Sequence, residues 1–206
     1  MFDVHTHNKD VVNGIVSCGV YDNTDGLKCL SMGIHPWNVS VLWEEELETM
    51  VRNCVSNEVS SRLAAIGEIG IDKVRGGSMQ LQKDCFKAQL YVAEKLRKPV
   101  ILHCVKAVSE VLACLKEVKF SQPVVFHGFR GRAPMARQLL VKGYYLSFGP
   151  NFNAESLRLA YGVGQMYLET DDSGVSIEKV YESASKVLSI PPTDIVVPGI
   201  FRSCAI

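Results

Sequence analysis

The sequence alternates between short apolar runs and longer segments in which apolar residues recur at helical spacing. This alternation is typical of a parallel α/β fold, because parallel strands need a long crossover, usually a helix, between them. Eight apolar runs predict strands at Phe2–His7, Gly14–Val20, Lys28–Gly33, Leu63–Ile69, Pro99–Cys104, Pro123–His127, Tyr144–Phe148 and Gln165–Thr170. Six segments predict helices at Val41–Asn57, Met79–Leu96, Val108–Lys119, Ala133–Lys142, Ala154–Tyr161 and Ser176–Leu188. Eight strands with helices between most of them favour a (β/α)8 TIM-type barrel over an open sheet.

The first two crossovers of the predicted barrel are too short to hold a helix. Only Asn8–Asn13 separates the first strand from the second, and only Tyr21–Leu27 separates the second from the third. The chain has 206 residues, whereas a typical barrel of this class has roughly 250. We therefore expect one domain, residues 1–206, that forms a shortened barrel with the helices missing after its first two strands.

The missing helices leave apolar side chains on the first three strands without their usual cover. The apolar side chains there are those of Ile15, Val16, Val20, Leu27, Leu30 and Met32, and some of them must point outward by alternation. Proteins rarely leave large apolar patches exposed, so another segment is expected to cover this flank. We expect the apolar C-terminal segment Ile190–Ile206 to do so in a monomer, with a homodimer as the alternative.

Composition describes an ordinary globular protein and excludes some function classes. Hydrophobic residues make up 47% of the chain, and 22 Lys and Arg balance 22 Asp and Glu to a net charge of zero. Nucleic acid binding through general positive charge is excluded, so contacts to phosphates must come from a local cluster. No apolar run reaches the roughly 18 residues of a membrane span, and the N-terminus lacks a secretory signal pattern. Seven scattered cysteines predict free structural thiols, including Cys104, and a cytoplasmic location.

Six residues with metal-binding side chains fall at the carboxyl ends of five predicted strands. They are His5, His7, Glu68, His103, His127 and Asp171. His5 and His7 share one face of their strand, and a barrel brings the carboxyl ends of all its strands into one ring, where active sites lie. Taken singly, each residue has a structural alternative: a buried histidine, a salt bridge of Glu68, or a helix cap by Asp171. Together, four imidazoles and two carboxylates suit zinc, manganese or iron, and suffice for two ions with Glu68 bridging them.

The motifs around these residues resemble the TatD family of metal-dependent hydrolases within the amidohydrolase superfamily. The matching motifs are His5-Thr6-His7, Gly33-Ile34-His35-Pro36, Gly67-Glu68-Ile69-Gly70-Ile71-Asp72, Leu102-His103, His127-Gly128-Phe129-Arg130-Gly131 and Glu169-Thr170-Asp171. The resemblance implies two divalent metal ions (Zn, Mg or Mn) held by the six residues above. It also implies phosphodiester hydrolysis, typically as a DNase, with nucleic acid as substrate. Asp171 and Glu68 would be catalytic, and Asp171 would accept a proton from the attacking water.

Further residues near the predicted site have possible supporting roles. His35 follows the third strand, and we expect it to contact substrate because the metals already have ligands. Arg130 and Lys73, with Arg132 and Arg75, lie in loops after strands that carry ligands and could neutralise phosphates; a solvated rim is the equal alternative. Asp3 could orient an imidazole from behind, and Glu169 could accept an N–H from a metal ligand.

Two rival functions remain open. The same metal pair could hydrolyse another bond, such as an ester, lactone or amide, since the metal-bound water is the same and only the pocket differs. Alternatively, the barrel could be degenerate and bind a partner without catalysis. The chain reads Cys104-Val105 where the family usually has Ser-Arg, and Lys73 replaces an aromatic residue, while the intact ligand set argues for an enzyme.

Overall fold

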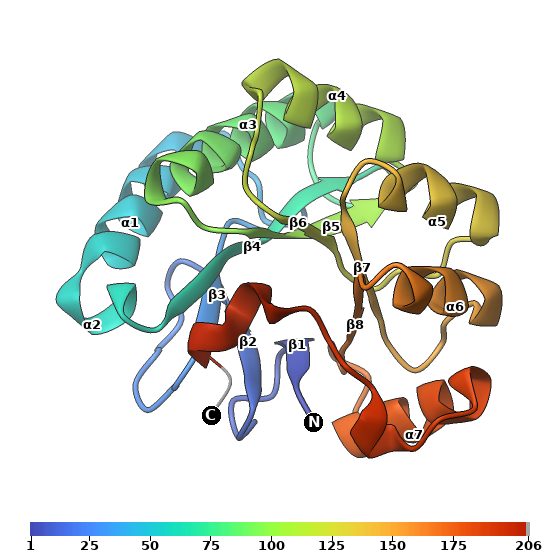
Figure 1. Ribbon diagram of the computed structural model, residues 1–206. Coiled ribbons are helices and arrows are strands. Elements are labelled where there is room, and N and C mark those ends of the chain that lie inside the picture. The colour runs from blue at the N-terminus through green and yellow to red at the C-terminus, as the bar shows by residue number, and fades with distance from the viewer. Residues whose placement is uncertain (205–206) are drawn as a thin grey trace. The chain divides into compact units, whose positions relative to one another are not determined.

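The protein has eight strands that follow one another along a single sheet in chain order. The computed structural model describes the backbone of residues 1–204 and the side chains of residues 1–201. The strands are β1 (Asp3–Thr6), β2 (Gly14–Cys18), β3 (Leu30–Met32), β4 (Leu63–Asp72), β5 (Val100–Val105), β6 (Val124–Phe126), β7 (Tyr145–Phe148) and β8 (Met166–Leu168). All eight predicted strands are present (Figure 1). β4 runs three residues beyond its predicted end at Ile69, because Gly70–Asp72 continue to pair with β5.

The six predicted helices are all present, whereas the short helix Asn57–Ser60 was not predicted. They are α1 (Trp43–Val55), α2 (Asn57–Ser60), α3 (Met79–Leu96), α4 (Val108–Val118), α5 (Ala133–Leu140), α6 (Ala154–Gly162) and α7 (Ile177–Leu188), followed by the short 3-10 helices η1 (Pro192–Asp194) and η2 (Gly199–Cys204). Residues 7–13 and 19–29, all within the described part of the chain, contain no helix. The predicted loss of the first two crossover helices is therefore confirmed.

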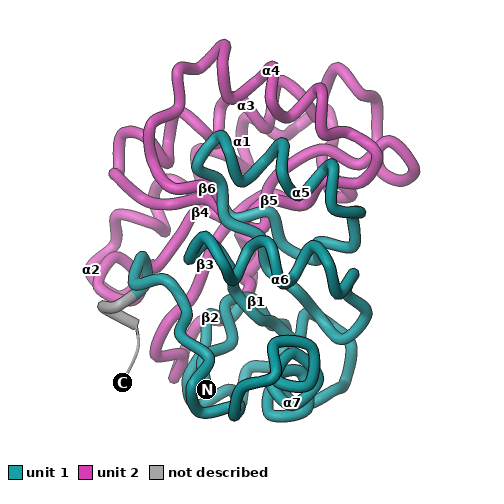
Figure 2. Tube along the Cα trace, turned by 45° about the vertical axis from the view of Figure 1, so that its right-hand side comes forward, with its two compact units in different colours: residues 1–16, 125–206 teal, residues 17–124 magenta. Residues whose placement is uncertain are grey.

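The chain divides into two compact units, shown in different colours in Figure 2. Unit 1 comprises residues 1–16 and 125–206, and unit 2 comprises residues 17–124. In unit 1 the two ends of the chain meet, because a parallel bridge joins Thr6 at the end of β1 to Asp171 just after β8. The last strand of the series thus returns to the first. The single-domain assignment stays a prediction.

Unit 2 is built around β4, whose ten residues are all buried. Burial of both faces is expected of a parallel strand that has helices packed on its sheet. Helix α3 packs against β4 and α4. The side chain of Ser78 caps the first turn of α3 by accepting a hydrogen bond from Leu81 N, and Arg97 ends the helix in the left-handed region at φ 52°. These local signals explain why α3 spans the predicted residues, Met79–Leu96.

The C-terminal segment packs on β8 within unit 1. The rings of Phe201 and Tyr167 lie 5.6 Å apart, and Tyr167 Oη donates a hydrogen bond to Pro198 O at 2.8 Å. Ile195 and Phe201 are buried. The six apolar side chains predicted to need cover are buried as well: Ile15, Val16, Val20, Leu27, Leu30 and Met32. Residues 205 and 206, the end of the predicted covering segment, lie outside the described residues. That this segment covers the first three strands stays a prediction.

The packing of Phe201 predicts a stability effect. Replacing this side chain, which is 3% exposed, by alanine should lower the free energy of unfolding by about 3–5 kcal/mol, because it opens a cavity beside Tyr167. Val196→Ala is the control, since Val196 is 75% exposed and its truncation should change stability by less than about 0.5 kcal/mol. Denaturant unfolding of both variants measures the difference. Equal midpoints for the two would show that the C-terminal segment adds nothing to the fold.

Two other predictions from composition have different outcomes. Cys18, Cys54, Cys85, Cys104 and Cys114 form no disulfide bond, as predicted. Cys29 is disulfide-bonded, so the prediction of a free thiol is wrong at this position. Among the described residues, no helix combines the length and the hydropathy that crossing a membrane requires.

Candidate metal centre

Unit 1 brings three of the predicted ligands together around one carboxylate oxygen. His5 Nε2 and His7 Nε2 each lie 3.6 Å from Asp171 Oδ1. His5 is fully buried in β1, whereas the side chain of His7 is 49% exposed, so this donor group reaches from the interior to the surface. The donor atoms of these three residues all lie within 4.8 Å of one another, as the ligands of one metal ion must.

The backbone fixes the three donors to one another. Asp171 N donates to His5 O at 3.0 Å, and His7 N donates to Asp171 O at 3.2 Å. Asp171 has a positive φ of 53°, which side-chain-bearing residues adopt rarely, although Asp and Asn tolerate it better than most. The two hydrogen bonds and this conformation hold the Asp171 carboxylate against the two imidazoles.

Asp3 anchors the segment before Asp171 rather than an imidazole ring. Its carboxylate accepts hydrogen bonds from Thr170 Oγ1 at 2.6 Å and Thr170 N at 3.1 Å, and from the backbone N of His5 at 3.4 Å. Burial raises the pKa of Asp3 to about 6, although the hydrogen bonds from Thr170 oppose this shift. Asp3 thus ties the C-terminal end of β8 to β1, which positions Asp171.

His127 and Glu169 form the other side of the group in unit 1. The rings of His127 and His5 lie 4.3 Å apart, and Glu169 Oε1 lies 3.4 Å from His127 Nδ1. The same oxygen accepts a hydrogen bond from Gly128 N at 2.6 Å, which orients the carboxylate. His127, Glu169 and Asp171 have donor atoms close enough to share an ion. The distance of 3.4 Å between Glu169 Oε1 and His127 Nδ1 agrees with the prediction that Glu169 contacts a metal ligand.

Unit 2 places two imidazoles on Glu68. His103 Nδ1 lies 2.7 Å and His35 Nε2 lies 3.0 Å from Glu68 Oε1. Glu68 is 6% exposed on β4, and His103 is 8% exposed on β5. These three residues form a second group of donor atoms within 4.8 Å of one another. A carboxylate buried among apolar strand residues is therefore accompanied by donors suited to a cation.

The hydrogen bonds of His35 indicate how its ring is protonated. Its Nδ1 accepts a hydrogen bond from Trp37 N at 3.2 Å. A neutral imidazole that accepts at one nitrogen carries its proton on the other, so Nε2–H points at Glu68. That His35 contacts substrate rather than metal stays a prediction.

Asp72, at the end of β4, contacts the opposite edge of the His103 ring. His103 Nε2 lies 3.0 Å from Asp72 Oδ2, which also accepts a hydrogen bond from Trp37 Nε1 at 2.7 Å. Burial alone would raise the pKa of Asp72, but the hydrogen bonds from Trp37, His103 and two backbone amides outweigh it and lower the pKa to about 2. Asp72 is therefore a carboxylate at neutral pH.

The basic residues that were predicted to contact phosphates have different surroundings. Arg130 and Arg132 are exposed, as a role in substrate contact requires. Lys73 Nζ forms an ion pair with Glu110, and the hydrogen bond from this lysine is the main reason that the pKa of Glu110 falls to about 2. The guanidinium of Arg75 lies 3.8 Å above the ring of Trp37. Lys73 is thus engaged within the protein, and Arg75 is held over an aromatic ring next to the His35 group.

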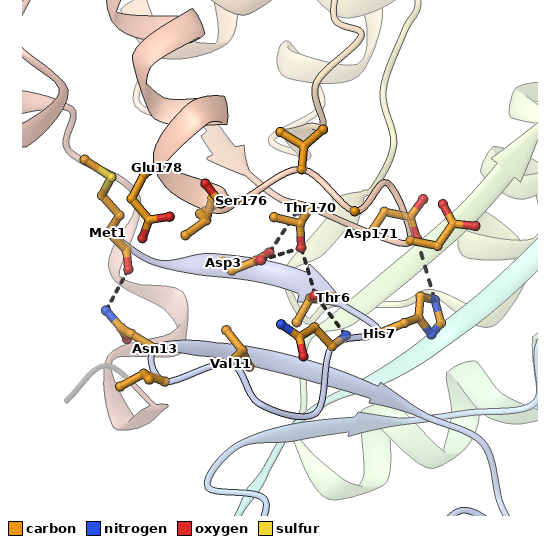
Figure 3. A pocket seen from close by; sticks show the side chains of 16 residues that line it. Met1, Asp3, Thr6, His7, Val11, Asn13, Thr170, Asp171, Ser176 and Glu178 are labelled. Atoms are coloured by element: carbon orange, nitrogen blue, oxygen red, sulfur yellow. Dashed lines mark hydrogen bonds and ion pairs between the residues drawn. The ribbon is translucent and has the colours of Figure 1, made fainter.

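A cavity of about 830 Å³ opens beside His7 and Asp171 in unit 1. Figure 3 shows its lining, which comes from β1, from the short connection that contains Val11 and Asn13, and from the segment that leads into α7. Ser176 and Glu178 lie on its far side. The loop that replaces the first crossover helix therefore forms one wall of the cavity, and the cavity gives a ligand access to His7 and Asp171.

Sequence reasoning did not assign Asp72, Trp37 or Gln82 to the site. Asp72 had a detectable signal, because Glu68 and Asp72 are four residues apart on one strand and share a face. Gln82 brackets the backbone of Asp72, with Asp72 N donating to its Oε1 at 2.9 Å and its Nε2 donating to Asp72 O at 3.2 Å. Trp37 lies in an irregular turn after Pro36, where periodicity gives no signal.

Most of the chain matches a known protein family. Residues 16–172 match the model of the family described as TatD related DNase. A stretch of 122 residues, 58% of this chain, is 32% identical to 46% of the uncharacterized metal-dependent hydrolase YabD from Bacillus subtilis. A stretch of 116 residues, 55% of this chain, is 35% identical to 43% of the 3′-5′ ssDNA/RNA exonuclease TatD from Cronobacter turicensis. The chain spans about half the length of the curated relatives it matches.

Solved structures confirm the fold. A TatD family hydrolase from Entamoeba histolytica aligns with a TM-score of 0.76 at 18% identity, covering 98% of this chain and 96% of that one. YJJV, a TatD homologue from Escherichia coli, aligns with a TM-score of 0.73 at 19% identity, covering 99% of this chain and 94% of that one. The predicted (β/α)8 TIM-type barrel is therefore the correct fold class.

Proposed function

The chain belongs to the family of TatD-related DNases, and from this premise we propose that it is a divalent-metal-dependent hydrolase that cleaves phosphodiester bonds in nucleic acid. The observation that carries the proposal is the clustering of metal-binding side chains in each unit. His5, His7 and Asp171 gather in unit 1, and Glu68 and His103 gather in unit 2. Relatives that match this chain are named as metal-dependent hydrolases and as a 3′-5′ ssDNA/RNA exonuclease.

The residues present suit a pair of divalent cations. Neutral imidazoles and carboxylates are the donors that Zn²⁺ and Mn²⁺ prefer, and carboxylates also suit Mg²⁺. Glu68 Oε1 and His103 Nδ1 lie 2.7 Å apart, within hydrogen-bonding distance, so these two donor atoms are close enough for both to reach one ion. The six-ligand set is His5, His7, Glu68, His103, His127 and Asp171.

The residues around the proposed metals have separate tasks. Bound ions would lower the pKa of a coordinated water and polarise an oxygen of the phosphoryl group whose phosphorus the water attacks. Asp171 keeps one partly exposed carboxylate, 28% accessible, next to two imidazoles, and we assign it the role of accepting the proton of the attacking water. His35 lies at the edge of the unit 2 group, with Nε2 3.0 Å from Glu68 Oε1, and we assign its ring to contact with the substrate.

Positive charge near the site is local, as a chain with no net charge requires. Arg130 follows His127 in an exposed loop, and Arg75 is stacked on Trp37 near His35. We assign both to contacts with the phosphates that flank the cleaved bond. Lys73 is a weaker candidate, because its ammonium is already paired with Glu110.

A substrate panel tests this proposal. The purified protein would be incubated with Mg²⁺, Mn²⁺ or Zn²⁺ and with single-stranded DNA, single-stranded RNA, bis(p-nitrophenyl) phosphate, p-nitrophenyl acetate and a lactone. We expect metal-dependent cleavage of the phosphodiesters and none after treatment with a chelator. Asp171→Asn serves as the matched inactive control, which separates this activity from that of a contaminating nuclease.

The rival functions give different results in the same panel. Hydrolysis of the acetate or the lactone without cleavage of any phosphodiester would replace the proposal by another reaction on the same metals. Tight binding of metal without hydrolysis of any substrate would identify a non-catalytic barrel.

A further inference from the structure

We propose that Trp37 and Arg75 form a platform on which an unpaired nucleobase of the substrate stacks. This inference rests on the proposed function, and it narrows the substrate class to strands whose bases are free, as in single-stranded nucleic acid. Both residues belong to unit 2. Neither side chain is a metal donor, so the platform adds a binding surface to the donor groups rather than another ligand.

Trp37 exposes its apolar ring to solvent while its polar N–H points inward. The residue is 41% exposed, and its Nε1 donates a hydrogen bond at 2.7 Å to Oδ2 of Asp72, which is only 4% exposed. A tryptophan at a protein surface usually presents its polar tip to water and buries its apolar body. The reverse arrangement at Trp37 leaves aromatic surface that a ligand can cover.

Arg75 lies over the ring of Trp37 without hiding it. The guanidinium carbon is 3.8 Å from the ring centroid, which is within the range of a cation–π interaction. Trp37 keeps its 41% exposure beneath this contact, and Arg75 is exposed as well. Bases stack on aromatic rings and on guanidinium planes alike, and a guanidinium also binds phosphate. The pair can therefore hold the base and the phosphate of one nucleotide.

The two segments that carry the platform are held against each other. The carboxylate of Asp72 accepts from Trp37 Nε1 and, at 3.0 Å, from the backbone N of Arg75, so one side chain fixes both. Gly76 has a positive φ of 100°, and a Cβ at this position would lie 2.6 Å from Pro36 O. The backbones are thus in direct contact. A surface that is ordered before binding loses little conformational entropy when a ligand arrives.

The platform lies next to residues that we assign to the substrate and to the metals. The ring centroid of Trp37 is 4.7 Å from that of His35 and 5.5 Å from that of His103. A base on Trp37 therefore belongs to a nucleotide that adjoins the cleaved bond. In a duplex the faces of each base are already covered by its neighbours, so the platform favours an unpaired strand.

Stacking also compensates for the lack of general positive charge. The chain has no net charge, whereas electrostatic attraction supplies most non-specific binding to nucleic acid. Proteins that bind single strands add aromatic rings on which bases stack, and the gain does not depend on the identity of the base. We therefore expect binding that depends on the presence of a base and little on which base it is.

Two short strands with the same number of phosphates test the platform. One is an oligothymidylate, and the other consists of abasic residues. Affinity is measured by fluorescence anisotropy with Mn²⁺ present, in the full chain carrying Asp171→Asn so that the strands stay intact. We expect the thymidylate to bind about 5–150-fold more tightly, which is the range for one base stacked on an aromatic ring.

Three further substitutions in this protein separate stacking from a structural role. Trp37→Leu should lower the affinity for the thymidylate to that for the abasic strand. Trp37→Phe keeps an aromatic ring but loses the hydrogen bond to Asp72, so it should retain most of the preference. Tyr91→Leu is the control, because Tyr91 is an aromatic residue of the same unit, 58% exposed on α3. Its removal should leave both affinities unchanged.

Tryptophan fluorescence reports the contact directly. The chain has two tryptophans, Trp37 and Trp43, so Trp43→Phe leaves Trp37 as the single emitter. The thymidylate should quench its emission, because a stacked base contacts the indole, and the abasic strand should not.

Equal affinity for the two strands would overturn the inference, as would an undiminished preference in Trp37→Leu. Equal losses in Trp37→Leu and Trp37→Phe would also overturn it, because the effect would then come from the hydrogen bond to Asp72. A preference for bases in a protein whose wild type cleaves no phosphodiester would support the platform and defeat the proposed function. Cleavage without any preference would do the opposite.

Discussion

Replacing Asp171 by asparagine is expected to lower kcat at least about 100-fold while the protein remains folded. Asp171 Oδ1 lies 3.6 Å from both His5 Nε2 and His7 Nε2, and loss of a general base typically costs about 10²–10⁴-fold in rate. Asparagine is chosen because it tolerates the positive φ of 53° at this position, as aspartate does, so the hydrogen bonds of the Asp171 backbone to His5 and His7 should persist.

Asp172→Asn is the matched control for this change. It removes the same charge one residue further along the chain, from an exposed side chain outside the donor groups. Steady-state cleavage of single-stranded DNA at saturating metal gives the comparison, and circular dichroism shows whether each variant is folded. Wild-type rates in Asp171→Asn under these conditions would remove Asp171 from both proposed roles.

The second large effect is expected at Glu68. Glu68→Gln should lose at least one of up to two bound divalent ions per chain and should be inactive at ordinary metal concentrations. The physical reason is the loss of charge from an oxygen that lies 2.7 Å from His103 Nδ1 and 3.0 Å from His35 Nε2. Glutamine keeps the shape of the side chain but attracts a cation far less, and a metal ligand should matter at least as much as the contacts behind it, which are worth about 10–100-fold in affinity.

Glu117→Gln provides the control for metal content. It makes the same change of net charge on the exposed surface of unit 2, where Glu117 pairs with Lys87. Elemental analysis after dialysis against metal-free buffer should give wild-type content for this variant and reduced content for Glu68→Gln. Unchanged metal content in Glu68→Gln would place Glu68 among the structural carboxylates instead.

The sequence predicted the fold well because the information is local. Each buried parallel strand must be an apolar run, and α3 has a Ser78 cap at its start and an amphipathic pattern throughout, so its bounds agree with the prediction. The end of β4 was missed because Gly70 and Asp72 resemble a turn in isolation. They stay in the strand because β5 pairs with them, and pairing is a tertiary property.

The metal-binding residues of the candidate site could be predicted once the sequence indicated a barrel. Carboxyl ends of strands converge, so ligands at those ends could be assigned without coordinates. The partners of those ligands could not be assigned in the same way. Lys73 forms an ion pair with Glu110, which lies in α4. Trp37 donates a hydrogen bond to Asp72 from an irregular turn. The disulfide of Cys29 also had no signal, since no cysteine pair has a recognisable spacing.

The meeting of the two chain ends in unit 1 has a consequence for the order in which the protein is made. Thr6 and Thr170, whose hydroxyls lie 2.8 Å apart, are separated by 164 positions. At about 5–20 residues per second, the ribosome adds Asp171 on the order of 10–30 s after His7. His5 and His7 therefore gain their partner Asp171 only after almost the whole chain has been made. His35, Glu68 and His103, by contrast, come from one continuous stretch. A chain arrested before Asp171 would carry a complete unit 2 donor group and an unfinished one in unit 1.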